Sequence, residues 1–176
     1  MKLILGGLLP ALLIAGCSVD VQQEVQGDRK RVDVRMPVGT VRVNTNVTAP
    51  DTGLEVYPGA RPRQDGDEPR SADVSIGAPF FGVHVVAAKF ESDDAPSQVV
   101  DFYRKALGEY GAVTECRGDI DFKGRSGSRP VCRERSRSKV LQLVAGTERR
   151  HRLVSVEPRG DGSEFAVVFI QTRGEG

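Results

Sequence analysis

Histidine is the side chain that most often performs acid–base or metal chemistry near neutral pH, and this chain contains two, His84 and His151. His84 lies in an apolar run typical of a β-strand, where an imidazole more often packs than binds a ligand. His151 lies among Arg149, Arg150 and Arg152, whose charges disfavour its protonation and repel a metal cation. Neither histidine is followed or preceded by a second metal-ligating residue at a sequence spacing typical of metal sites. We therefore predict no catalytic histidine, no metal site and no cofactor.

Other short motifs that could perform chemistry have simpler explanations. The chain lacks the GxSxG turn of serine hydrolases. The start of residues 119–124 resembles a calcium loop, but Lys123 takes its fifth position and Pro130 its twelfth, where calcium needs a glutamate. The tripeptide Arg159-Gly160-Asp161 matches a cell-adhesion sequence, and a hairpin turn explains the same residues. We expect no catalytic residues.

Cys17, which follows an apolar segment, is a further residue whose side chain could take part in chemistry. Lys2 precedes an uncharged apolar run over 3–15, too short to span a bilayer but suited to a signal peptide. Ile14-Ala15-Gly16-Cys17 resembles the lipobox of bacterial prolipoproteins. The resemblance implies that residues 1–16 are cleaved and that Cys17 receives acyl chains such as palmitate. It also implies anchoring in the cell envelope, facing the periplasm, and Ser18 slightly favours the outer membrane.

The remaining cysteines are Cys116 and Cys132. An even pair in an exported protein favours a disulfide, which would contribute about 3 kcal/mol by closing a short loop. A redox or metal pair is the alternative, although the pair lacks CxxC spacing. We predict a structural disulfide.

Basic residues are concentrated in 117–159, which holds twelve basic and five acidic side chains in a chain of net charge +1. A charged edge strand that resists aggregation explains this pattern. A surface for an anionic partner, either an envelope component or an acidic protein, is the alternative. No aromatic platform accompanies the arginines, so nucleic acid is not expected. The candidate surface consists of Arg133, Arg135, Arg137, Arg149, Arg150 and Arg152.

The mature chain divides by composition into four parts. Residues 17–29 are polar and are expected to form a flexible, lipidated tether. Residues 30–46 show two alternating apolar runs around a Pro/Gly turn, which predicts a β-hairpin. Residues 47–71 form a linker rich in proline and charge. Residues 72–174 are expected to form the main domain.

Within that domain, apolar residues recur at helical spacing from Val99 to Tyr110, and this pattern predicts an amphipathic helix. Pro96 is tolerated in its first turn. Strands are expected before the helix and, after it, over 112–117, 129–134, 139–145, 152–156 and 164–172. We predict an α+β fold in which a single helix covers one face of an antiparallel sheet.

The segment Tyr57-Pro58-Gly59-Ala60, together with Phe90 and the Phe102-Tyr103 pair of the helix, resembles a group of uncharacterised bacterial envelope proteins. In these proteins a YPGA turn precedes a strand and an FY-bearing helix. The resemblance implies the fold and leaves the function open.

We therefore expect a membrane-anchored envelope lipoprotein with a non-enzymatic binding or scaffolding domain. Two alternatives stay open: an enzyme whose site assembles from scattered residues, and a protein with a purely structural role in envelope integrity.

Overall fold

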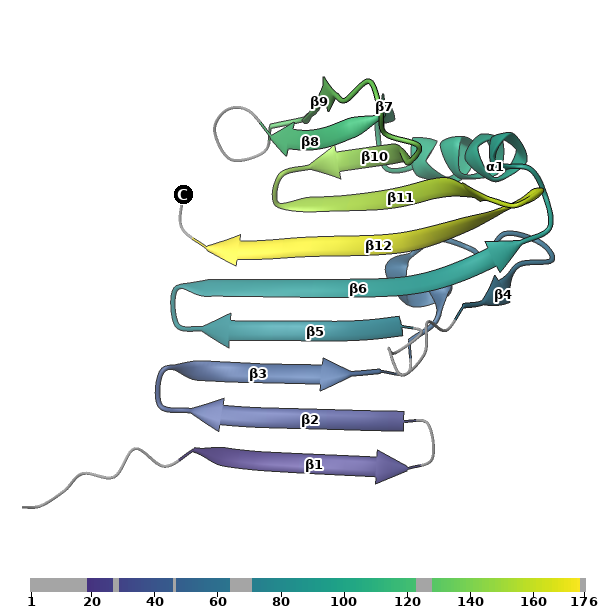
Figure 1. The fold of residues 1–176 in the computed structure, drawn as a ribbon. Helices are drawn as coiled ribbons and strands as arrows, with labels where there is room; N and C mark the ends of the chain where they lie inside the picture. Colours follow the sequence, from purple (N-terminus) through teal and green to yellow (C-terminus); the bar gives the residue numbers. More distant parts are fainter. Residues whose placement is uncertain (1–18, 27–28, 46, 64–70, 123–127, 175–176) are drawn as a thin grey trace, which may run out of the picture.

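The computed structural model describes residues 19–26, 29–45, 47–63, 71–122 and 128–174. It consists of a large antiparallel sheet, one α-helix on one face of that sheet and a small two-stranded hairpin (Figure 1). The predicted α+β class is confirmed.

The elements up to the helix are β1 (Asp20–Gln26), β2 (Arg29–Met36), β3 (Gly39–Asn44), the 3-10 helix η1 (Ala49–Thr52), β4 (Arg61–Pro62), β5 (Ser71–Ala78) and β6 (Phe81–Ser92). The helix and the elements after it are α1 (Pro96–Gly108), β7 (Thr114–Cys116), β8 (Gly118–Phe122), β9 (Pro130–Glu134), β10 (Leu141–Thr147), β11 (Arg150–Arg159) and β12 (Gly162–Gly174).

The main sheet has ten strands, and nine of them follow the order β1-β2-β3-β5-β6-β12-β11-β10-β7. The tenth, β4, pairs with β6 beyond the end of β5. Strands β8 and β9 form a separate hairpin. The chain therefore folds most of its length into a single sheet.

The N-terminal part of the chain differs from the expected tether. The predicted hairpin is present as β2–β3, but the tether segment 17–29 contains β1, which pairs along its whole length with β2. Val21 and Val25 are four residues apart in β1, and this spacing places both side chains on the same face of a strand. Because β3 also pairs with β5, the N-terminal strands extend the main sheet.

The expected linker over 47–71 is in part a core segment. Leu54 and Tyr57 are buried against the helix and sheet. The backbone N–H of Tyr57 donates to the Tyr103 hydroxyl at 3.2 Å, and that hydroxyl donates to the carbonyl oxygen of Glu55 at 3.2 Å. The apolar residues of this segment, which is otherwise rich in proline and charge, thus cover part of the sheet in addition to the helix.

The predicted helix is present as α1. It buries Val99, Val100, Tyr103 and Leu107 against β10, β11 and β12. Ala95 occupies the N-cap position without a side-chain hydrogen bond, and Pro96 follows it in the first turn, as expected.

The predicted strands after the helix correspond to β7, β9, β10, β11 and β12. The turn-rich stretch between the two cysteines, however, contains a further strand, β8, which pairs with β9. Phe122, at the end of β8, packs its ring 4.6 Å from that of His151. This hairpin therefore lies over the face of the main sheet that α1 leaves open.

The two faces of the sheet differ in cover, since alternate residues of a strand point to opposite sides. One face carries α1 and η1 and includes Val154 and Val167, both fully buried. The other face carries two rows of β-branched side chains, which we call the valine face. Its first row is Val21, Val34, Val41, Ile76 and Val83, and its second is Val32, Val43, Val74, Val85 and Ile170.

Candidate functional site

One end of the main sheet, which we call the rim, brings together the start of β1 and the turns of two hairpins. The register aligns Asp20 with Arg35 and Gly82 with Arg173. The start of β1, the β2–β3 turn, the β5–β6 turn and the end of β12 therefore lie at the same end of the sheet, on the left in Figure 1. The rim consists of Val19, Asp20, Arg35–Gly39, Ala78–Phe81, Glu148–Arg150, Arg173 and Gly174.

Large apolar side chains protrude from the rim. The exposed fraction is 81% for Phe80, 71% for Val38, 56% for Val19, 50% for Phe81 and 37% for Met36. Hairpin turns normally carry polar residues or glycine, so apolar residues at two adjacent tips are unusual. Together they form an apolar edge exposed to solvent.

The two hairpin tips are held close together by the backbone. Each two-residue turn begins with a proline, which is Pro37 in the β2–β3 turn and Pro79 in the β5–β6 turn. A side chain at Gly39 would meet the carbonyl oxygen of Gly77 at 2.3 Å, so only glycine permits this approach of β3 to β5. The apolar tips therefore lie on neighbouring hairpins of one rigid sheet.

Arginines flank the apolar tips. Arg35, Arg149 and Arg173 are exposed at the rim, and none of them forms an ion pair with another described residue. The carbonyl oxygen of Arg149 accepts a hydrogen bond from the Thr172 N–H at 2.8 Å, which joins the β10–β11 turn to β12. The rim is thus an apolar edge bordered by positive charge.

The six arginines proposed as an anionic-partner surface are not brought together. Arg149 and Arg150 belong to the rim. Arg133 and Arg135 lie on the β8–β9 hairpin, where they form ion pairs of 2.7 Å with Asp121 and 2.6 Å with Asp119. The paired charges give the hairpin little excess positive charge for an anionic partner. Arg137 is exposed in the turn after β9.

Arg152, the sixth, is buried on the helix side of the sheet. Its guanidinium carbon lies 3.6 Å from the centre of the Tyr110 ring and 5.0 Å from that of Phe169. Its Nε donates to the carbonyl oxygen of Thr52 at 2.8 Å. Burial lowers the pKa of Arg152. This arginine therefore has a structural role and contributes nothing to a binding surface.

The predicted disulfide is present between Cys116 and Cys132, whose Cα atoms lie 5.3 Å apart. It links β7, at the edge of the main sheet, to the β8–β9 hairpin. The Gln142 side chain adds a hydrogen bond of 2.6 Å to the carbonyl oxygen of Gly118. The disulfide thus fixes the hairpin on the sheet. Cys17, the predicted lipidation residue, lies outside the described residues.

Neither histidine is part of a catalytic arrangement among the described residues. His151 is buried under Phe122, which lowers the pKa of its imidazole, and its Nδ1 lies 3.0 Å from the carbonyl oxygen of Thr147. His84 is paired with Asp73 at 2.9 Å. Ser75 lies opposite His84 in the register, but no hydrogen bond joins them. A nucleophile–base pair is therefore not formed there.

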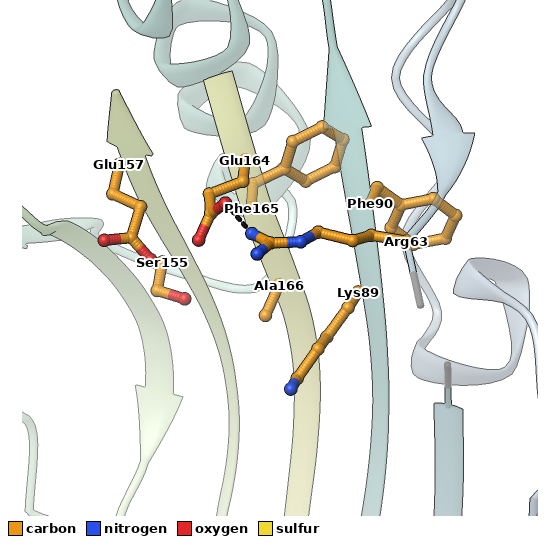
Figure 2. A pocket seen from close by; sticks show the side chains of 8 residues that line it. All are labelled: Arg63, Lys89, Phe90, Ser155, Glu157, Glu164, Phe165 and Ala166. Atoms are coloured by element: carbon orange, nitrogen blue, oxygen red, sulfur yellow. Dashed lines mark ion pairs between the residues drawn. The ribbon is translucent and has the colours of Figure 1, made fainter. Parts of the chain in front are cut away.

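A small pocket lies at the other end of the sheet, on the side of the valine face. Its volume is about 210 Å³. Figure 2 shows Arg63 extending across it to Glu164, with which it forms an ion pair, while Lys89 reaches in from β6. The lining residues are Arg63, Lys89, Phe90, Ser155, Glu157, Glu164, Phe165 and Ala166. The lining presents carboxylates, basic groups and the Ser155 hydroxyl, which could bind a small polar group.

Ion pairs beside the pocket fasten β4 to the sheet. Arg61 pairs with Asp93 at 2.9 Å and with Glu91 at 3.6 Å, and Arg159 pairs with Glu91 at 2.8 Å. The Arg61 guanidinium lowers the pKa of the Asp93 carboxyl. This end of the molecule is therefore charged and internally paired, unlike the apolar rim.

Sequence reasoning missed the rim. The signal for it was present at Pro79-Phe80-Phe81 and Pro37-Val38, where apolar residues stand in turns that usually contain polar ones. Their position next to the start of β1 depends on the sheet order, which spans residues far apart in the chain.

Among the described residues, no cluster of three or more histidine, cysteine, aspartate or glutamate side chains could hold a metal ion. None of the helices in the described part of the chain has the length and hydropathy needed to cross a membrane. Comparison with protein-family models, curated proteins and solved structures finds no match to this chain.

Proposed function

We propose that this protein is a membrane-anchored bacterial envelope lipoprotein. Its lipidated residue is Cys17, and its folded part is a non-enzymatic binding or scaffolding domain seated on the membrane by the rim. The observation that carries the proposal is the position of the rim: the exposed apolar tips lie at the end of the sheet where β1 begins.

The distance between lipid and fold is short. Cys17 precedes the first residue of β1, Asp20, by three positions, and an extended chain covers about 3.5 Å per residue. Acyl chains on Cys17 would therefore hold the rim within about 11 Å of the lipidated residue. The domain would sit directly on the bilayer instead of extending from it on a long tether.

The composition of the rim fits that position. Phe80, Phe81 and Val38 would bury apolar surface among the lipid headgroups, where each buried CH₂ contributes about 0.8 kcal/mol. Arg35, Arg149 and Arg173 lie where they would meet anionic headgroups, a contact that contributes about 1 kcal/mol for each basic residue near the surface. Lipid headgroups are thus the anionic partner that these arginines fit best.

Two further features support export and a binding role. Disulfides such as Cys116–Cys132 persist in oxidising compartments, which include the bacterial periplasm. The pocket is lined by charged groups of both signs, two of which, Arg63 and Glu164, form an ion pair. Binding to another envelope component is the role that this combination supports.

Metabolic labelling with an alkyne analogue of palmitate in a bacterial host tests the anchor. The wild-type protein is expected to incorporate the label and to remain in the membrane fraction. The Cys17→Ser variant is expected to lose the label, whereas the Cys132→Ser variant, matched in chemistry, is expected to keep it. An unlabelled wild-type protein, or equal labelling of Cys17→Ser, would contradict the proposal.

A further inference from the structure

We infer that the valine face is an interface with a second copy of this chain, so that two sheets pack face to face as a symmetric dimer. The inference begins from the ten β-branched residues of its two rows, which lie on one side of the sheet from β1 to β12. No charged residue interrupts either row.

Among the described elements, only the β8–β9 hairpin lies over this face, and it lies at the edge formed by β7 and β10. The helix α1 packs on β10, β11 and β12, and η1 packs on β6 and β12, both from the other side. The β8–β9 hairpin contacts β10 and β7, at the far edge of the sheet. Val21 and Ile76 are 60% and 41% exposed, and the other eight residues of the two rows are half-buried.

The size of the face matches a stable interface. The register continues the same face with a row toward the rim, which includes Met36, Ala78 and Phe81, and with a row on the other side, which includes Ala72, Ala87 and Val168. Lys30 is the one charged residue in these added rows. Strands lie about 4.8 Å apart and residues on one face repeat about every 6.8 Å along a strand, so five strands and these four rows present about 600 Å². Two such faces would bury about 1,200 Å², the lower limit for specific protein–protein interfaces. A monomer rarely leaves an apolar patch of this size exposed.

The shape of the face selects the partner. Valine and isoleucine on a pleated sheet form a flat surface, and the surface complementary to it is another such sheet, packed about 10 Å away. The chain itself supplies one, and an interface that uses the same patch on both copies closes as a two-fold dimer.

A second copy, and not a lipid surface, covers the valine face, because the membrane contacts the rim. This step rests on the proposed function. With the rim on the bilayer, the strands stand upright and the valine face points sideways, away from the lipid. A two-fold axis parallel to the strands places both rims at the same end of the dimer. Both anchors then reach one membrane, which raises the effective concentration of each copy for the other.

The mass of the full-length protein, extracted from membranes and measured by sedimentation equilibrium in density-matched detergent, tests the inference. The wild-type protein is expected to sediment as a dimer. Val74→Asp would place an unpaired carboxylate in the interface and is expected to raise the dissociation constant by about a hundredfold. The matched control, Ser75→Asp, changes the next residue of β5, on the other face, and is expected to leave the dimer intact.

Val74→Thr, which keeps the shape of the side chain, provides a second variant in case Val74→Asp fails to fold, and it is expected to weaken the dimer by about tenfold. A wild-type protein that is monomeric, or bound only to another protein or to lipid, would overturn the inference. Equal dimerisation of Val74→Asp, Val74→Thr and Ser75→Asp would also overturn it. A wild-type protein that dimerises but incorporates no palmitate label would contradict the anchor alone.

Discussion

Arg152 lies over the ring of Tyr110, with 3.6 Å between the guanidinium carbon and the ring centre. The same side chain donates a hydrogen bond from Nε to the carbonyl oxygen of Thr52. Tyr110 follows the helix, Thr52 ends η1 and Arg152 belongs to β11. One arginine therefore joins the two segments that cover the sheet to the sheet itself.

Replacing this arginine is expected to destabilise the fold. Arg152→Met keeps much of the apolar volume but loses the cation–π contact and the hydrogen bond to Thr52, a loss of about 2 kcal/mol in the free energy of unfolding. Urea denaturation followed by circular dichroism measures the change. Arg149→Met, an exposed neighbour, is the control and is expected to change stability by less than about 0.5 kcal/mol. Equal stability of the two variants would refute a structural role for Arg152.

The seating of the rim predicts which positions contact lipid. An environment-sensitive fluorophore attached to Phe80→Cys or Val38→Cys in the membrane-bound protein is expected to be quenched by lipids that carry a nitroxide near the headgroup. The same fluorophore at Val25→Cys is the control, since Val25 is 57% exposed but lies toward the other end of β1. Equal quenching at Phe80 and Val25 would show that the protein does not contact the membrane preferentially through the rim.

His151 predicts a dependence of stability on pH. Burial lowers its pKa from the ordinary value of 6.5, so the folded protein binds a proton less readily than the unfolded chain does. The contribution of the neutral imidazole is complete above pH 6.5 and is lost as the pH falls through the folded pKa. The free energy of unfolding is therefore expected to decrease as the pH falls from about 7.5 to about 5.5.

Chemical denaturation at several pH values measures this effect. His151→Gln is expected to flatten the dependence in this range, because the titrating group is removed. His84→Gln is the matched control and is expected to keep it, since His84 is partly exposed and paired with Asp73. A pH profile of His151→Gln identical to that of the wild-type protein would assign the dependence to other groups.

Local patterns predicted the elements whose residues are close in sequence. The helical spacing from Val99 to Tyr110 predicted α1, because a 3.6-residue period determines a buried face within a few turns. Alternation around Pro37 predicted the β2–β3 hairpin. Cysteine parity in an exported chain predicted the disulfide.

Other features depended on contacts between distant residues. The polar segment before residue 30 became β1 because β2 offered it a partner along its whole length. Arg152 was grouped with its exposed neighbours by charge, yet alternation along β11 placed its side chain under Tyr110, whose position depends on the helix.

By itself, therefore, the sequence determined the helix, the hairpin, the fold class and the expectation of a lipidated Cys17, all of which depend on short-range periodicity or on a local motif. Only the tertiary structure decided that Val38 and Phe80 share one rim and that valines from five strands share one open face. Strand order and register produce these surfaces, because they bring together residues that no local spacing relates.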